Sequence, residues 1–246
     1  MCIRDSSLIE QSRNALTCKT PVNADGFGLA WYLNHAEPCL YKDTHPAWSD
    51  ANLKQISHQT KASLILAHVR ASTGTATSRN NCHPFSSGNW SFMHNGQVGG
   101  HEKIRKYLDS YIPEEFYSAR YGATESEAIF LMAMGFGLSK QPISAMERAV
   151  GMAENLSRSK GCTPHMRFSA CWSDGEKIYA ARYASDNFAP SLCYLRTDEG
   201  AIVASEPLTS NTSDWTHVSS DEAIVITSND IRHANFTPLS EATVEH

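Results

Sequence analysis

The sequence predicts a single domain of the layered α+β class, with strands at both ends of the chain and two helices between them. Three observations support this class: short apolar runs bounded by turn residues come first, two stretches with helical spacing follow, and five short strands come last. Strands and helices that alternate would instead indicate a parallel sheet. A length of 246 residues suits one domain, and no internal repeat or long linker divides the chain.

The first half of the chain contains three predicted strands and two weaker helical segments. Leu29–Leu33 follows a glycine-rich turn, and Ser63–Val69 is an apolar run of core-strand length. Trp90–His94 is a third apolar run, and the pair Asn95-Gly96 is expected to end it as a turn. The helical segments are Asp50–Thr60 and His101–Leu108.

Two amphipathic helices are predicted in the middle of the chain. In Glu125–Leu138, Thr124 can act as the N-cap, and Glu127 follows three residues later as in a capping box. In Ile143–Ser157, apolar residues recur at helical spacing. The first helix is expected to bury one side, formed by Ile129, Met132, Ala133 and Phe136.

Five short strands and a polar tail are predicted after the helices. Asp174-Gly175 and Glu199-Gly200 supply two of the turns between strands. Residues 231–246 are predicted to be a polar tail outside the domain. The strands are Met166–Trp172, Lys177–Tyr183, Ser191–Arg196, Ala201–Ser205 and Glu222–Ser228.

Composition and charge argue against several classes of protein. A net charge of -5 and the absence of a basic block disfavour nucleic-acid binding. The sequence has no run of 18 apolar residues and no secretory signal pattern, so neither a membrane span nor secretion is expected. The seven cysteines are scattered and form no C-x-x-C pair, which favours a reducing compartment and predicts a cytoplasmic protein. A metal site is disfavoured, because Arg105 stands where an H-E-x-x-H pattern would need its second histidine.

Three polar segments carry side chains that could bind or transform a substrate. Asn23–Gly28 is glycine-rich but precedes a strand, which disfavours a phosphate loop and leaves a tight turn as an even alternative. In Ala67–Thr73, Arg70 could clamp a carboxylate through two N–H···O bonds, although a surface arginine is the commoner arrangement. In the third segment, the Asn95 amide and the Gly96 N–H could form an oxyanion hole, although Asn-Gly more often marks a hairpin turn.

Taken together, these segments resemble the class II glutamine amidotransferases, which belong to the N-terminal-nucleophile hydrolase superfamily. The resemblance rests on the order and spacing of N-x-D-G-F-G, A-H-V-R-A-S-T, H-P-F and H-N-G, with T-E-S-E at a helix start and A-S-E-P late in the chain. It is greatest to the short branch that includes the γ-glutamyl amidohydrolase of ergothioneine biosynthesis and glutathione-degrading amidotransferase subunits. It implies a four-layer α/β/β/α sandwich that spans residues 7–230.

The resemblance implies a glutamyl-binding role for four residues. Arg70 would hold the α-carboxylate, and Ser72 or Thr73 would line the same pocket. The family has an aspartate that binds the substrate α-amine, and Glu125 stands at that position here. Because glutamate is one methylene longer, amine recognition is expected to be shifted or weaker.

The resemblance also implies which groups stabilise the reaction. Asn95 and Gly96 would form the oxyanion hole, and His94 would shape the turn behind it. Asp25 and Gly26 would support the site near the nucleophile.

The family nucleophile is a cysteine that becomes the first residue once the initiator Met is removed, so that its α-amine can take the thiol proton. Met1-Cys2 has this form, but the family cysteine begins an apolar strand tens of residues before the segment that matches Ser7–Ser12. Residues 1–6 also read as the translation of a common transposon sequencing adapter. We therefore expect them to be a non-native leader, with the native first strand and its cysteine missing.

The implied reaction is hydrolysis of a γ-glutamyl amide through a Cys thiolate and a glutamyl thioester, which releases glutamate and ammonia or an amine. The reaction needs no metal and no organic cofactor. One alternative is a glutaminase subunit that supplies ammonia to a separate synthetase, and another is a glutamyl-binding regulatory protein without a nucleophile. The sequence leaves open whether the substrate is glutamine or a larger γ-glutamyl amide.

Overall fold

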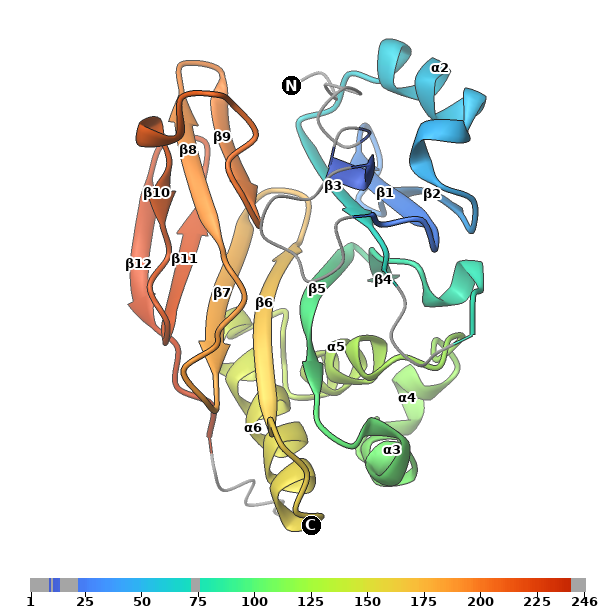
Figure 1. Cartoon of the computed structure of the whole chain (residues 1–246), viewed down its shortest axis with the longest axis vertical. Helices are drawn as coiled ribbons and strands as arrows, with labels where there is room; N and C mark the ends of the chain where they lie inside the picture. The colour runs from blue at the N-terminus through green and yellow to red at the C-terminus, as the bar shows by residue number, and fades with distance from the viewer. Residues whose placement is uncertain (1–8, 10, 14–21, 72–75, 240–246) are drawn as a thin grey trace.

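The computed structural model describes residues 9, 11–13, 22–71 and 76–239, which form a mixed helix and sheet structure (Figure 1). Its largest element is a six-stranded sheet in which every neighbouring pair of strands is antiparallel. The strand order is β12 (Ile231–Asn235), β11 (Glu222–Ile226), β7 (Ile178–Ala184), β6 (Met166–Ser173), β5 (Trp90–Val98) and β4 (Phe85–Ser87).

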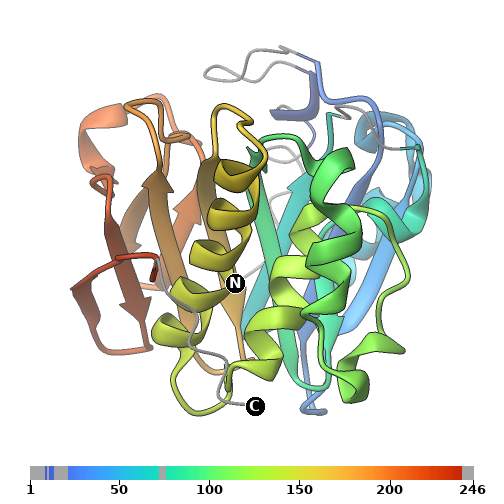
Figure 2. The same ribbon diagram turned by 90° about the horizontal axis from the view of Figure 1, so that it is seen from below.

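Four helices form a layer on one face of this sheet, and Figure 2 shows them side by side across it. Rings from both layers stack in the core, with the Phe92 centroid 5.6 Å from that of Phe130. The Thr124 side chain caps the third of these helices by accepting a hydrogen bond from the Glu127 N–H, as predicted. The helices are α3 (His101–Ser110), α4 (Glu114–Tyr117), α5 (Glu125–Gly135) and α6 (Pro142–Ser159).

Two three-stranded sheets lie against the opposite face of the large sheet. Met93 and Ile178 on that face contact the apolar clusters of both small sheets, so the two sheets occupy neighbouring parts of one layer. One small sheet has the order β2 (Cys39–Asp43), β1 (Phe27–Tyr32) and β3 (Leu64–Val69). The other has the order β10 (Thr216–His217), β8 (Cys193–Thr197) and β9 (Gly200–Ala204).

Helix α2 (Ala51–Gln59) covers the outer face of the first small sheet, where Leu53 packs against Phe27 and Leu29. The Asp50 carboxylate caps this helix by accepting a hydrogen bond from the Leu53 N–H at 2.7 Å. Short 3₁₀ turns are formed by Ala47–Ser49, Arg79–Asn81 and Thr212–Asp214.

The prediction that α5 buries only one side is incomplete. Residues 126–133 are all buried, because α6 and the sheet cover this helix from different directions. The short or polar elements β2, β4, β10, β12 and α4 were not predicted, since none of them has an apolar period long enough to be recognised.

The prediction of a polar tail from residue 231 is wrong for its first part. β12 (Ile231–Asn235) pairs with β11 along its whole length, and the Phe236 ring is fully buried 5.6 Å from the Phe168 ring. The strand is polar because it lies at the edge of the sheet, where most of its side chains face solvent. The ordered fold therefore continues past residue 230.

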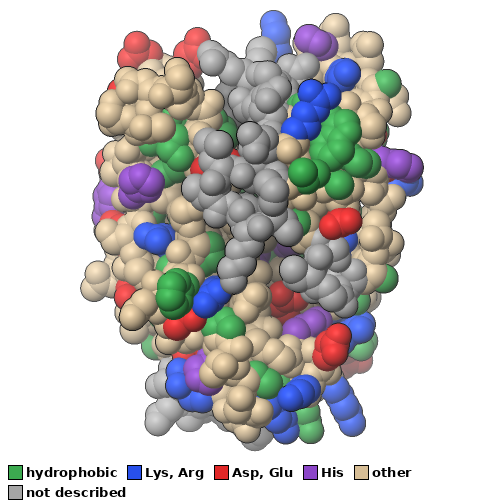
Figure 3. Space-filling model, viewed as in Figure 1, with side chains coloured by type: hydrophobic (Ala, Val, Ile, Leu, Met, Phe, Trp, Pro, Cys, Tyr) green, Lys and Arg blue, Asp and Glu red, His purple; other side chains and the backbone are tan. Residues whose placement is uncertain are grey.

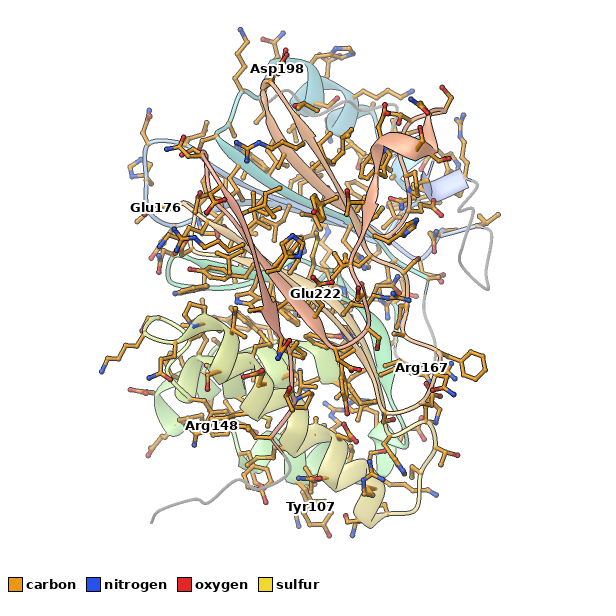
Figure 4. All side chains as sticks on the ribbon, turned by 90° about the vertical axis from the view of Figure 1, so that its left-hand side faces the viewer. Tyr107, Arg148, Arg167, Glu176, Asp198 and Glu222 are labelled. Atoms are coloured by element: carbon orange, nitrogen blue, oxygen red, sulfur yellow. The ribbon has the colours of Figure 1, made fainter. Side chains whose placement is uncertain are left out.

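Acidic and basic side chains are interspersed on the face of the molecule shown in Figure 3. In Figure 4, Arg167 and Glu222 extend from the large sheet, whereas Arg148 and Tyr107 extend from the helix layer. No helix within the described part of the chain is long and apolar enough to cross a membrane.

Candidate active site

The alternation of β5 divides its side chains between two environments. Phe92 packs in the core beneath the helices, whereas Met93 packs against the small sheets on the other face. Because side chains alternate along a strand, His94 lies on the helix side and Asn95 lies between the two sheet layers. The Asn95 amide therefore points toward the layer that holds β1 and β3.

The expected turn at Asn95-Gly96 does not form. Both residues continue β5 and pair with Ser169 and Phe168 of β6, so the long register with β6 overrides the local turn preference. A Cβ at Gly96 would lie 2.0 Å from the Arg167 carbonyl oxygen and 2.5 Å from His94 Nε2. Glycine is thus required here by the close approach of neighbouring atoms.

His94 connects β5 to β6 and to the start of α5. Its Nε2 lies 3.3 Å from the Arg167 carbonyl oxygen, which can only accept, so Nε2 carries the proton. Its Nδ1 lies 2.9 Å from Ser126 Oγ and accepts a hydrogen bond from that hydroxyl. Burial lowers the pKa of His94 although the charge of Glu125 opposes this effect, so the ring is neutral. His94 thus braces the strand that carries Asn95.

Arg70 is held at the end of β3 by the glycine-rich segment. Its N–H donates to the Gly26 carbonyl oxygen at 2.8 Å, and its carbonyl oxygen accepts from the Asp25 N–H at 3.0 Å. The Arg70 side chain is buried and donates from Nη1 to the Asp25 carbonyl oxygen at 3.4 Å. The structure therefore brings together two segments that the sequence analysis had singled out separately.

A cluster of three imidazoles, those of His68, His83 and His94, connects the Arg70 and Asn95 regions. The His68 and His83 rings are 4.4 Å apart, and the positive charge of Arg70 acts on His68. Burial and this charge lower the pKa of His68 to about 4, and that of His83 also falls well below its ordinary value. All three rings are neutral near pH 7, whereas Arg70 and Lys42 bring positive charge to this region.

The neutral imidazoles predict that the protein loses stability as the pH falls from about 6.5 to 4. Below their ordinary pKa the histidines bind protons in the unfolded chain, whereas His68 in the folded protein stays neutral until about pH 4. Each such group contributes a slope of up to ~1.4 kcal/mol per pH unit. Urea unfolding at several pH values measures this slope. His68→Gln should reduce the slope by up to ~1.4 kcal/mol per pH unit, which corresponds to one proton. An unchanged slope in that variant would show that His68 does not carry the effect.

Glu125 begins α5 next to the same region. Its Oε2 lies 3.8 Å from His101 Nδ1, and its charge acts on His94. The neighbouring Glu127 does not complete the capping box suggested by the sequence. Its carboxylate accepts from the N–H groups of Tyr121 and Gly122, at 3.2 and 2.8 Å, and from Arg120. These bonds shape the loop that leads into Glu125.

Asn81 and the Arg120–Glu127 ion pair are structurally prominent groups that the sequence analysis did not single out. Polar residues near a motif are common, and nothing in their spacing indicated that they meet across the fold. The predicted site residues Cys2, Ser72 and Thr73 lie outside the described residues.

The described side chains include no group of three or more His, Cys, Asp or Glu residues that could hold a metal ion. The five described cysteines are all free. Three of them are buried, and burial raises the pKa of each of these thiols, which disfavours the reactive thiolate form. They are Cys82, Cys171 and Cys193.

The family model for glutamine amidotransferases class-II matches residues 11–197. The chain therefore belongs to the class II glutamine amidotransferases and is an enzyme of the amidohydrolase type.

Two curated relatives support this assignment. The probable glutamine amidotransferase DUG3 of Saccharomyces cerevisiae is 30% identical over 89% of this chain and 75% of its own length. The γ-glutamyl-hercynylcysteine sulfoxide hydrolase of Mycolicibacterium smegmatis is 23% identical over 76% of this chain and 70% of its own length.

Solved structures of other proteins are also similar to this one. A glutamine aminotransferase class-II domain protein from Silicibacter pomeroyi is 45% identical, with a TM-score of 0.80 over 86% of this chain and 92% of that chain. The glutamine phosphoribosylpyrophosphate amidotransferase of B. subtilis shares only the fold, with 15% identity and a TM-score of 0.66 over 95% of this chain and 46% of that chain.

Proposed function

We propose that the protein hydrolyses a γ-glutamyl amide through a cysteine thiolate and a glutamyl-thioester intermediate. The observation that carries this proposal is the placement of Asn95 on the inner face of β5, between the two sheet layers. The end of β3 that carries Arg70 leads toward the same space. The Asn95 amide and the Gly96 N–H would donate to the carbonyl oxygen as negative charge develops on it. Arg70 would bind the α-carboxylate of the glutamyl group, and Glu125 its α-amine.

Ser72 and Thr73, which follow Arg70 in the sequence, are proposed to line the same pocket. Asp25 and Gly26 support the site indirectly, because their backbone groups hold Arg70 at the end of β3. No metal ion or organic cofactor enters the proposed reaction.

The nucleophile is proposed to lie on a strand beside β3 and β9. Among the described strands, β3 pairs only with β1, and β9 pairs only with β8, so each small sheet ends at one of these edges. A strand between them would join the two small sheets into one layer. A cysteine at the start of such a strand could reach the carbonyl held by Asn95. This arrangement also supports the four-layer α/β/β/α sandwich, with α2 outermost on one side and α3 to α6 on the other.

The proposed substrates are glutamine or a larger γ-glutamyl amide. Both are consistent with the relatives, since one is named a glutamine amidotransferase and the other a hydrolase of a γ-glutamyl compound. A second candidate function is that of a glutaminase subunit, for which the first of these names is the supporting observation.

The decisive experiment compares glutamate release by this chain, by its Cys2→Ala variant, and by a chain in which an apolar strand that begins Met-Cys precedes Ser7. Glutamine and a panel of γ-glutamyl amides serve as substrates. We expect the extended chain to be active and its nucleophile Cys→Ala variant to be inactive. If this chain is active and Cys2→Ala abolishes the activity, Cys2 is the nucleophile. If no form releases glutamate or binds it, the proposed hydrolysis is refuted.

A further inference from the structure

Asn81 lies in the 3₁₀ turn Arg79–Asn81 and uses both ends of its side-chain amide. Its Nδ2 donates to the Ala76 carbonyl oxygen at 2.8 Å, and its Oδ1 accepts from the Ala123 N–H, also at 2.8 Å. The side chain is buried, with the residue 3% exposed. Because this buried amide makes hydrogen bonds to two separate backbone segments, it is a rigid link between them.

The two linked segments lead to the two ends of the proposed glutamyl pocket. Ala76 lies six residues after Arg70 in the sequence, and Arg70 would bind the α-carboxylate. Cys82, next to Asn81, lies close to Gly26, where a Cβ would be 2.8 Å from Cys82 Sγ, and the Gly26 carbonyl oxygen accepts from the Arg70 N–H. Ala123 directly precedes Thr124 and Glu125, and Glu125 would bind the α-amine. The Asn81 amide therefore connects the carboxylate-binding side of the pocket to the amine-binding side.

Close packing leaves little freedom in this connection. A Cβ at Gly122 would lie 2.5 Å from the Asn80 carbonyl oxygen and 2.7 Å from Asn81 Oδ1. The Gly122 N–H also donates to the buried Glu127 carboxylate at 2.8 Å, so the loop is fixed from its other side. A small change at Asn81 would therefore move the loop that contains Gly122 relative to Arg70, because the close packing leaves no space for a local adjustment.

We propose that Asn81 is a positioning residue that sets the separation between Arg70 and the amine-binding Glu125, and thereby selects ligands that carry both an α-carboxylate and an α-amine. This inference rests on the proposed function. A purely structural link would instead affect the stability of the fold without changing which ligands bind.

The test measures dissociation constants by calorimetry for L-glutamate and for glutarate, which lacks the α-amine. Neither ligand can be hydrolysed, so the measurement does not depend on the nucleophile. We expect the dissociation constant of L-glutamate to be at least about tenfold lower than that of glutarate, because one charge-assisted hydrogen bond contributes about this much to affinity. Asn81→Leu removes both hydrogen bonds and should reduce the preference to within about threefold.

Asn81→Asp separates the two links. It keeps an acceptor for the Ala123 N–H and loses the donor to the Ala76 carbonyl oxygen, so both ligands should bind several-fold more weakly with their ratio retained. Asn80→Leu is the matched control, because exposed Asn80 donates to the Tyr121 carbonyl oxygen at 3.3 Å in the same loop pair. The control should keep both the affinities and the ratio.

The outcomes separate this inference from the proposed function. If this chain binds L-glutamate no better than glutarate, amine recognition by Glu125 is refuted, and the inference falls with it. If the preference is present and a folded Asn81→Leu variant keeps it, Asn81 is only structural. Should Asn81→Leu fail to fold, unchanged affinities in Asn81→Asp would overturn the inference instead.

Discussion

Replacing Asn95 with Ala is expected to lower kcat for glutamate release by about 10²–10³-fold. The amide lies on the inner face of β5, and the next residue, Gly96, has its backbone fixed against Phe168 of β6. A donor held this rigidly stabilises developing charge without first having to reorient. KM should change much less, because the ground-state carbonyl needs this donor less than the oxyanion does.

Steady-state kinetics on the active form of the chain measure this effect. Gln97→Ala is the matched control, since Gln97 lies two residues further along the same face of β5 and is exposed. The control should retain kcat within a few-fold. Equal losses in both variants would mean that the Asn95 effect comes from a disturbed strand and not from a lost oxyanion donor.

Replacing Arg120 with Met is expected to destabilise the protein by about 3–5 kcal/mol, because it leaves a buried carboxylate without its counter-ion. Arg120 Nη1 lies 2.7 Å from Glu127 Oε2, and the two side chains are only 5% and 4% exposed. Its Nε also donates to Asp109 at 3.0 Å. Urea unfolding gives the change in the free energy of unfolding.

Arg158→Met provides the comparison. This arginine pairs with Glu154 one helical turn away at 2.6 Å, but its side chain is 56% exposed. Water reaches Arg158, and Glu154, although only 9% exposed, keeps its hydrogen bond from the Tyr183 hydroxyl, so the loss of Arg158 should cost less than about 1 kcal/mol. A similar small loss for Arg120→Met would show that the Glu127 carboxylate is already satisfied by the Tyr121 and Gly122 N–H groups.

The long elements could be predicted from the sequence because local patterns determine them. The strand Leu64–Val69 and the helices Glu125–Gly135 and Pro142–Ser159 lie within a few residues of the predicted segments. Each has either an apolar run of the right length or a helical period with a capping residue. The edge strand Ile231–Asn235 was missed, since a strand that pairs on one side only needs no apolar alternation.

The candidate site, too, could be predicted from the sequence only in part. The sequence determined which residue types could bind a glutamyl group, because Arg70, Asn95 and Gly96 lie in motifs with recognisable chemistry. Only the tertiary structure decided that Asn95-Gly96 is strand and not turn, since eight residue pairs with β6 outweigh a two-residue turn preference. Only the tertiary structure brought Asn81 against Ala123, because hydrogen bonds between residues 42 positions apart depend on how the chain packs and leave no periodic signal in the sequence.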